Sequence, residues 1–320
     1  MQSAKHYLEL INQTLAQVEY PAWLPGLYEP IRYTMASGGK RLRSTLLLAM
    51  SDAFGGDLQQ SVWPAVGVEM FHNFTLAHDD VMDHADMRRG RPTVHKKWDV
   101  NTAILSGDAM VSMAFKCMTG CPPECLPEVI DRFGVMTMQV YEGQQIDGDF
   151  EKEERVGFDD YLRMIVGKTS ALIAYPCAIG AIIAGAAPED VENVFNFGVS
   201  LGIAFQMQDD YLDVYGDPAT FGKAIGGDIL NDKKTWLHIM ARDQDADGSF
   251  QSLLAQKLEP AEKIMRVTAA YDALNLREQG EKLVSRYTED AISYLKHTTM
   301  GDEAKDWFID YAHNLLGRNK

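Results

Sequence analysis

Two aspartate clusters with the same spacing are the residues of this chain best suited to chemistry. The pattern D-D-x-x-D occurs at Asp79, Asp80 and Asp83 and again at Asp209, Asp210 and Asp213. Each cluster follows an apolar run of helical periodicity, and because positions i and i+4 share a helix face, each directs at least two carboxylates the same way. Mg²⁺ relieves the repulsion of such carboxylates and typically combines one or two of them with substrate phosphates. The pair of clusters predicts Mg²⁺ binding; two solvated acidic helix ends are the simpler alternative.

Basic residues lie near both clusters and favour the first interpretation. The segment Gly38–Arg43, G-G-K-R-L-R, precedes an apolar run, so its backbone N–H groups and cationic side chains could converge on a phosphate. Further positive charge follows at Arg88, Arg89 and Arg91 and at Lys168, Lys223, Lys233 and Lys234. Guanidinium groups suit diphosphate oxygens, although any one of these residues alone could be a solvated surface charge. Together with the carboxylates they indicate a diphosphate ligand.

Two other groups of residues have spacings found in metal sites. Cys117, Cys121 and Cys125 are spaced by four, but two prolines interrupt the segment and no local histidine or fourth cysteine completes a zinc set, so free thiols are expected. Glu69 and His72 form an E-x-x-H motif, as in di-iron carboxylate bundles, but that site needs a second copy, which the sequence lacks.

The elements that must position these residues are helices. Apolar residues recur at three- and four-residue spacing in Tyr7–Leu15, Leu42–Met50, Ala65–Leu76, Thr102–Met118, Leu126–Tyr141, Val191–Tyr211, Ile264–Ala273, Gly280–Leu295 and Ala304–Leu316. Alternating β-branched runs are scarce, and only the short stretch Arg242–Gly248 resembles a linker. The pattern predicts an all-α protein with one domain over residues 1–320, a single large helical bundle.

Composition limits the partners and the compartment. The chain has 30 Lys and Arg against 46 Asp and Glu, a formal charge of −16, which argues against non-specific nucleic-acid binding. The polar N-terminus lacks the apolar core of a signal peptide, so the cytoplasm is the expected location. Thr169–Ala187 is uncharged and just long enough to span a membrane, but it is rich in Ala and Gly and contains Pro176. We therefore expect buried core helices there and no membrane span.

These motifs resemble those of the trans-isoprenyl diphosphate synthases of the polyprenyl synthetase family. The resemblance rests on G-G-K-R-L-R at Gly38–Arg43, H-D-D-V-M-D-x-x-x-x-R-R-G at His78–Gly90, G-Q-x-x-D at Gly143–Asp147, G-K-T at Gly167–Thr169, F-Q-x-x-D-D-x-x-D at Phe205–Asp213, and F-G-K-x-x-G-G-D-I followed by N-D-K-K-T up to Thr235. It implies an isoprenoid-synthase helical bundle around a deep apolar pocket, a homodimer, and Mg²⁺-dependent head-to-tail condensation of an allylic diphosphate with isopentenyl diphosphate.

The resemblance also implies roles for individual residues. Three Mg²⁺ ions would be coordinated by Asp79, Asp83 and Asp209, with direct or water-mediated support from Asp80, Asp147, Asp210 and Asp213. The allylic diphosphate would be held by Arg88, Lys168, Lys223 and Lys233. The diphosphate of isopentenyl diphosphate would be held by Lys40, Arg43, His72 and Arg89. The developing allylic cation would face Lys168, Thr169 and Gln206, the residues expected to be catalytic.

Two related functions stay open as alternatives. A class I terpene cyclase shares the first aspartate motif, but its second motif usually mixes Asn, Ser or Thr with Glu, whereas here the second motif is all aspartate. An inactive, substrate-holding subunit of a heteromeric synthase tends to lose one aspartate cluster, and here both are present.

Product length is expected to depend on the helix that carries the first cluster. Phe74 precedes Asp79 by five residues, about 7.5 Å of helical rise, and could form the floor beneath the growing chain, next to the smaller Thr75. The alternative is that Phe74 is ordinary core packing. An aromatic residue here with a small neighbour resembles archaeal-type geranylgeranyl synthases, so a C20 product is favoured over C15 and over longer chains.

Overall fold

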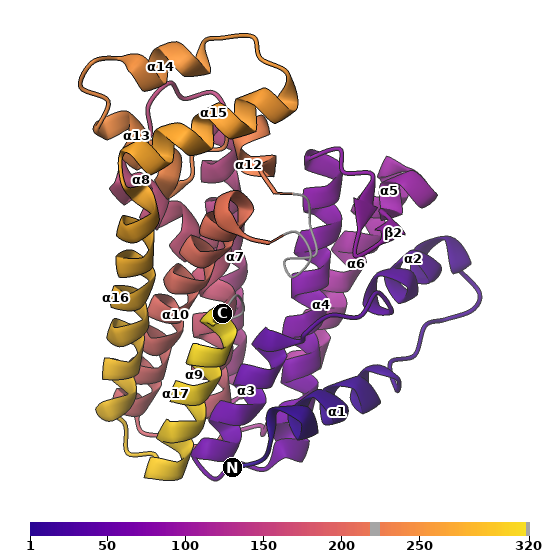
Figure 1. The fold of residues 1–320 in the computed structure, drawn as a ribbon. Helices are drawn as coiled ribbons and strands as arrows, with labels where there is room; N and C mark the ends of the chain where they lie inside the picture. Colours follow the sequence, from indigo (N-terminus) through magenta and orange to yellow (C-terminus); the bar gives the residue numbers. More distant parts are fainter. Residues whose placement is uncertain (218–224, 318–320) are drawn as a thin grey trace. The chain divides into compact units, whose positions relative to one another are not determined.

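The computed structural model describes residues 1–217 and 225–317, which are almost entirely helical (Figure 1). In the first half the elements are α1 (Ala4–Leu15), α2 (Pro25–Met35), α3 (Leu42–Ala53), α4 (Leu58–Met82), β1 (Met87–Arg88), β2 (Arg91–Pro92), α5 (Val94–Lys97), α6 (Val100–Met118) and α7 (Leu126–Phe150). In the second half they are α8 (Phe158–Ile165), the π-helical turn η1 (Val166–Ser170), α9 (Ala171–Ile183), α10 (Pro188–Tyr215), α12 (Gly227–Leu230), α13 (Trp236–Asp243), α14 (Ser249–Leu254), α15 (Pro260–Ala273), α16 (Leu276–Lys296) and α17 (Asp302–Leu316). The predicted all-α class is confirmed.

The chain divides into two compact units, and each is described by itself. Unit 1 comprises Met1–Val135, Tyr175–Glu192 and Thr299–Gly301. Unit 2 comprises Met136–Ala174, Asn193–Thr298 and Asp302–Lys320. The first aspartate cluster belongs to unit 1 and the second to unit 2. The prediction of one domain over residues 1–320 stays a prediction.

Unit 1 is built around α4, which contacts α1, α3 and α6. Its core contains fully buried Leu46, Leu47, Val66 and Val68, and a buried aliphatic side chain of this kind contributes about 1.5–3 kcal/mol. Helices α4 and α6 approach closely at Gly67, where a Cβ atom would lie 2.9 Å from Cys117 Cβ. This approach fixes α4, the helix that carries the first aspartate cluster.

Unit 2 has its own core beneath the second cluster. Trp236, the first residue of α13, is fully buried, and its Nε1 donates a hydrogen bond to the Met207 carbonyl oxygen at 3.1 Å. Helices α13, α14 and α15 contact one another, and α13 and α15 both contact α16, as Figure 1 shows at the upper end of that helix. The hydrogen bond from Trp236 therefore links α13 to α10, the helix that carries the second cluster.

Side-chain caps begin several of these helices. Ser3, Asp57 and Asp99 accept hydrogen bonds from backbone N–H groups at the starts of α1, α4 and α6, and each such cap contributes about 1 kcal/mol. Sequence periodicity did not predict α2, because Pro25 and Pro30 interrupt the pattern; Pro25 instead occupies the first turn, where a missing N–H costs nothing. The two-residue strands β1 and β2 were also not predicted.

Within the part of the chain that the structure describes, one continuous helical run has the length and composition of a membrane span. It covers Phe158–Ile183, and 83% of its most apolar window is buried in protein. The run continues through Pro176, which lies inside α9. Burial of this extent is what a core helix requires, in agreement with the expectation for Thr169–Ala187.

Candidate active site

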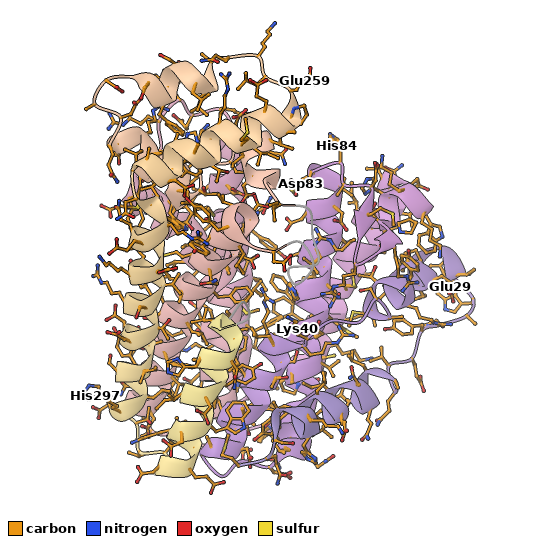
Figure 2. The ribbon with its side chains drawn as sticks, viewed as in Figure 1. Glu29, Lys40, Asp83, His84, Glu259 and His297 are labelled. Carbon is orange, nitrogen blue, oxygen red and sulfur yellow. The ribbon has the colours of Figure 1, made fainter. Side chains whose placement is uncertain are left out.

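The first aspartate cluster lies at the C-terminal end of α4. Asp79 and Asp80 belong to the last helical turn, and Asp83 is the C-cap residue. Figure 2 shows Asp83 with His84 at the upper end of this helix, and Lys40 lower down, on the loop before α3. The carboxylates of residues 79 and 83 are one helical turn apart, so they can share a cation.

Asp80 differs from its neighbours because it is buried. Its Oδ1 is 2.7 Å from Arg88 Nε, with which it forms an ion pair. Burial raises the pKa of Asp80, and the Arg88 charge opposes that change. The hairpin β1–β2 brings Arg88 to this position: Met87 pairs with Pro92 and Arg88 with Arg91.

The turn of that hairpin directs Arg89 towards the loop before α3. Arg89 and Gly90 have φ of 51° and 72°, the left-handed pair of a tight hairpin turn. Arg89 Nη1 donates to Ser37 Oγ at 3.1 Å and also to the Gly38 carbonyl oxygen. Arg89 therefore lies against the segment that precedes Lys40.

His72 and Arg43 form the other part of this cationic cluster. His72 Nε2 lies 3.2 Å from Arg43 Nη1. Burial, followed by the nearby charge of Arg43, lowers the pKa of His72 well below its ordinary value, so the imidazole is neutral at neutral pH. The four residues expected to hold isopentenyl diphosphate thus come from four places in unit 1: Lys40 from the loop before α3, Arg43 from the first turn of α3, His72 from α4 and Arg89 from the turn between β1 and β2.

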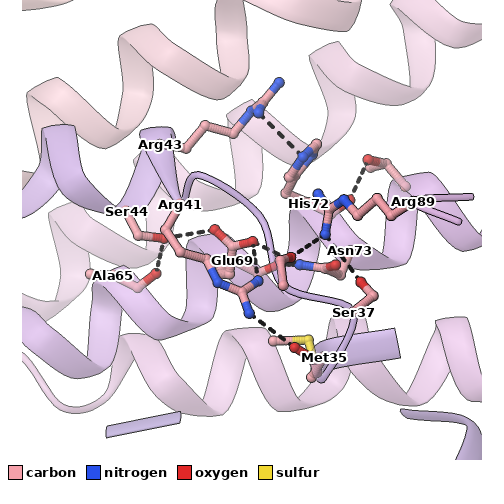
Figure 3. Close-up of polar contacts among 12 residues, drawn as sticks. Met35, Ser37, Arg41, Arg43, Ser44, Ala65, Glu69, His72, Asn73 and Arg89 are labelled. Carbon is pink, nitrogen blue, oxygen red and sulfur yellow. Dashed lines mark hydrogen bonds and ion pairs between the residues drawn. The ribbon is translucent and has the colours of Figure 1, made fainter. Parts of the chain in front are cut away.

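Arg41, between two of these cations in sequence, points into the protein instead (Figure 3). Its Nη1 is 2.7 Å from Glu69 Oε1, and its Nη2 donates to the Met35 carbonyl oxygen at 2.9 Å. Asn73 Nδ2 donates to Glu69 Oε1 at 2.8 Å. Sequence reasoning missed this network, although Glu69, His72 and Asn73 have the spacing of one helix face.

The second group of predicted residues lines one cavity of about 180 Å³ in unit 2. The cavity is lined by Asp147, Tyr161, Met164, Ile165, Lys168, Thr169, Gln206, Asp210, Asp228, Lys233, Lys234 and Thr235. Six of these were predicted as site residues: Asp147, Lys168, Thr169, Gln206, Asp210 and Lys233. They come from α7, η1, α10 and the segment before α13. The fold therefore brings together residues that are far apart in the sequence.

Lys168 and Thr169 lie on the π-helical turn η1, an irregularity often found at functional sites. Lys168 Nζ donates to Asp147 Oδ2 at 2.6 Å, and Lys233 Nζ lies 3.9 Å from the same oxygen. Gly143 allows the close approach of α7 to this turn, since a Cβ there would lie 2.7 Å from the Gly167 carbonyl carbon. Asp147 is thus placed between two predicted diphosphate-binding lysines.

A chain of hydrogen bonds joins Thr169 to Tyr161. Thr169 Oγ1 donates to Gln206 Oε1 at 2.9 Å, and Gln206 Nε2 donates to Asp210 Oδ1 at 2.8 Å. The Tyr161 hydroxyl donates to Asp210 Oδ2 at 2.7 Å. Burial, followed by the nearby Asp228 carboxylate, raises the pKa of Asp210 well above its ordinary value, whereas both hydrogen bonds lower it.

The remaining members of the second cluster lie on the exposed side of α10. Asp209 and Asp213 are both partly exposed, one helical turn apart. Asp213 Oδ2 accepts a hydrogen bond from the Asp228 backbone N–H at 2.9 Å. Asp228 and Tyr161 were not predicted; Asp228 stands in the quoted G-G-D-I segment, which was the available signal. Lys223, predicted to hold the allylic diphosphate, lies outside the described residues.

The carboxylates fit Mg²⁺ that is completed by a substrate. Within residues 1–217 and 225–317, no group of three or more His, Cys, Asp or Glu side chains is arranged to hold a metal ion. Mg²⁺ seldom uses an all-protein cage and usually takes one or two carboxylates with substrate phosphates, which suits the pairs at residues 79 and 83 and at 209 and 213.

Phe74, the predicted floor residue, belongs to a column of aromatic rings in unit 1. Its side chain is 6% exposed, and its ring lies 4.5 Å from that of His78 and 5.4 Å from that of Phe71. Phe71 contacts Phe133 edge to face at 5.7 Å. Thr75 lies on a different face and donates through Oγ1 to the His72 carbonyl oxygen at 2.8 Å.

Neither of the two alternative metal motifs is suited to hold a metal ion. Glu69 is paired with Arg41 and His72 contacts Arg43, so this E-x-x-H pair is not available to iron. The four cysteines are free thiols. Burial raises the pKa of Cys117 to about 11 and that of Cys121 to about 12, which keeps both protonated and disfavours metal binding at neutral pH.

Comparison with known proteins identifies the family. The family profile described as "Polyprenyl synthetase" matches residues 24–274. A geranylfarnesyl diphosphate synthase from Natronomonas pharaonis is 38% identical over 97% of this chain and 95% of its own length. A geranylgeranyl diphosphate synthase from Sulfolobus acidocaldarius is 36% identical over 93% of this chain and 92% of its own length.

Solved structures similar to this chain point to the same family. A crystal structure of a geranylgeranyl pyrophosphate synthase superposes with a TM-score of 0.95 at 37% identity, covering 100% of both chains. The geranylgeranyl pyrophosphate synthetase from Pyrococcus horikoshii superposes with a TM-score of 0.91 at 30% identity, covering 98% of this chain and 96% of the other. The predicted isoprenoid-synthase fold and prenyltransferase class are confirmed. The chain belongs to the polyprenyl synthetase family.

Proposed function

We propose that the protein condenses an allylic diphosphate with isopentenyl diphosphate, head to tail, and releases an all-trans C20 prenyl diphosphate. The observation that carries the proposal is the unit 2 cavity, in which carboxylates, lysines and neutral oxygen acceptors from four separate chain segments line one space. Such a set can bind a diphosphate and also solvate a carbocation, and neither role requires a protein nucleophile.

Mg²⁺ is proposed to bind with the allylic diphosphate at the two aspartate clusters, three ions per site as the family resemblance implies. The ions would neutralise the charge that develops on the departing diphosphate. Asp79, Asp83 and Asp209 are the proposed ligands, with Asp80, Asp147, Asp210 and Asp213 in support. Arg88, Lys168, Lys223 and Lys233 are proposed to contact the same diphosphate.

In the proposed reaction the allylic C–O bond breaks, and its electron pair leaves with the diphosphate. The double bond of isopentenyl diphosphate then attacks the cation, forming the new C–C bond, and a diphosphate oxygen takes the proton that is lost. Because the Thr169 hydroxyl hydrogen is donated to Gln206, the lone pairs of Thr169 Oγ1 are left to face the cation. Neutral oxygen acceptors of this kind stabilise the carbocation without forming a covalent bond to it.

The second diphosphate is proposed to bind at the cationic cluster of unit 1, at Lys40, Arg43, His72 and Arg89. The short contact between His72 and Arg43 supports this assignment, because a neutral imidazole can sit beside a guanidinium and still hydrogen-bond to an anion.

The C20 length is supported by the geranylgeranyl synthases among the similar proteins and by the buried Phe74 ring. A C25 product is the second candidate, since a geranylfarnesyl synthase is 38% identical to this chain. We further propose a homodimer in the cytoplasm, as the family resemblance implies.

One experiment tests the proposal. The purified protein is incubated with isopentenyl diphosphate, Mg²⁺ and in turn each allylic starter of C5, C10 and C15, and the products are identified by mass spectrometry. A C20 diphosphate is expected. Cyclic hydrocarbons would instead indicate a terpene cyclase, and no turnover with any starter would indicate a substrate-holding subunit.

A further inference from the structure

A buried ion pair joins Arg41, which lies between Lys40 and Arg43 in sequence, to Glu69 on α4 (Figure 3). The Arg41 side chain is 4% exposed and that of Glu69 is 2% exposed, with 2.7 Å between Nη1 and Oε1. Ser44 Oγ lies 3.2 Å from Glu69 Oε2, and Asn73 donates to Oε1. A charge pair enclosed to this degree does not meet a substrate, so its effect must act through the residues that it holds.

What the pair holds is a loop of unusual backbone conformation. Gly38, Gly39 and Arg41 have φ of 74°, 132° and 47°. An arginine rarely adopts the left-handed region, and such a conformation persists only where the surrounding structure enforces it. The guanidinium supplies that enforcement, because one nitrogen is bound to Met35 at the end of α2 and another to Glu69 on α4.

The same loop sets the relative positions of the cations. Lys40 and Arg43 flank Arg41 in sequence, and Arg89 donates to Ser37 and to the Gly38 carbonyl oxygen. His72, which contacts Arg43, is three residues from Glu69 and therefore on the same face of α4. A change in the loop backbone would move these groups relative to one another.

We propose that Arg41 and Glu69 are positioning residues, whose ion pair fixes the Gly38–Arg43 loop in the shape that binds the diphosphate of isopentenyl diphosphate. This inference rests on the proposed function, because it deepens the assignment of one of its two substrate sites. Glu69 has a second effect: its negative charge offsets the mutual repulsion of the Arg41 and Arg89 guanidinium groups.

The test compares steady-state kinetics and thermal unfolding of the wild type with Glu69→Gln, Arg41→Met and the double variant Arg41→Met/Glu69→Gln. Each single variant is expected to raise the KM for isopentenyl diphosphate about tenfold or more, while the KM for the allylic substrate changes less than about threefold. In the double variant no buried charge is unpaired, so the melting temperature should recover. The KM for isopentenyl diphosphate should nevertheless stay high, because the loop is no longer held.

A matched control is Asp190→Asn, which neutralises another buried carboxylate of unit 1. Asp190 is 3% exposed and accepts a hydrogen bond from the Thr299 N–H at 2.8 Å. This variant should lose stability without changing either KM. Arg41→Lys keeps the positive charge, but an ammonium group cannot bind Met35 and Glu69 with one planar fork. This variant should therefore raise the KM for isopentenyl diphosphate by an intermediate amount. It replaces Glu69→Gln in the test if that variant does not fold.

Recovery of both the melting temperature and the KM in the double variant would overturn the inference and reduce the pair to a purely structural role. Equal increases of both KM values in the single variants would do the same. A wild type without prenyl transfer would overturn the proposed function first, and the inference with it. Wild-type turnover with unaltered KM values in the variants would overturn the inference alone.

Discussion

Both carboxylate oxygens of Asp210, the middle member of the second cluster, accept hydrogen bonds from the protein. Tyr161 and Gln206 donate to its two oxygens, and the residue is 5% exposed, whereas Asp209 and Asp213 are partly exposed. This arrangement favours a supporting role for Asp210, in which it orients Gln206 and through it Thr169. The two outer aspartates of D-D-x-x-D are then better suited to direct metal binding than the middle one.

Tyr161→Phe tests this arrangement because it removes one hydroxyl and leaves the ring in place. Loss of a buried hydrogen bond to a charged group is expected to lower the free energy of unfolding by about 1.5–3 kcal/mol. Turnover should fall about tenfold with little change in either KM, since Thr169 and Gln206 are proposed to act on the developing cation. Urea denaturation and initial rates provide the measurements. Tyr287→Phe, a partly buried tyrosine beside the same core, is the control, and an equal loss of turnover there would contradict the assignment.

Single elements explain why part of the site could be predicted and part could not. Asp79 and Asp209 could be predicted because an i, i+4 pattern at the end of an apolar helix is visible in the sequence. The inward direction of Arg41 could not, since Lys40, Arg41 and Arg43 are all basic and only the left-handed backbone at Arg41 separates them. The turn η1 was also not visible, because one extra residue in a helical turn barely alters hydrophobic periodicity.

Helix α4 carries two groups of predicted site residues along its length. Its C-terminal end carries the first aspartate cluster, and about one and a half turns earlier it carries Phe74. Phe71 lies about 4.5 Å further down the helix axis and is braced by Phe133. The column therefore offers a second ring below the first.

Phe74→Ala is expected to lengthen the main product by about one isoprene unit, because the Phe71 ring then becomes the floor. Phe71→Ala combined with Phe74→Ala should lengthen it further. Each Phe→Ala change costs about 3–5 kcal/mol, so circular dichroism must first establish folding. Mass spectrometry of the products provides the measurement, and Val68→Ala, a buried residue elsewhere on α4, is the control. If the product distribution were the same in all three variants, another residue would set the length.

For the molecule as a whole, the −16 formal charge makes anionic substrates dependent on cations. EDTA is therefore expected to abolish turnover, and excess Mg²⁺ to restore it. Asp79→Ala in unit 1 and Asp209→Ala in unit 2 should each lower turnover about 100- to 1,000-fold while the helical circular dichroism signal persists. The exposed Asp131→Ala is the matched control. Near-normal rates in EDTA would argue against a metal-dependent reaction.

The stability of the molecule should fall in mild acid because of a buried histidine on α13. His238, on α13, is 6% exposed and packs edge to face against Phe250. Burial lowers its pKa from 6.5 to about 4, with smaller contributions from the positive charges of Lys234, Arg242 and Lys263 that the Asp232 carboxylate opposes. The imidazole is therefore neutral in the folded protein throughout the physiological range.

Because the unfolded chain binds this proton more readily than the folded chain, stability must rise with pH between the two pKa values. The contribution is complete above about pH 6.5, falls as the pH drops towards 4, and is constant below that value. The separation of about 2.5 pH units corresponds to about 3 kcal/mol. Urea denaturation of His238→Gln from pH 4 to 7 should show a shallower pH dependence than the wild type, whereas His297→Gln, at an exposed position, should match the wild type. Identical slopes for the wild type and His238→Gln would mean that His238 titrates in the folded protein as it does in the unfolded chain.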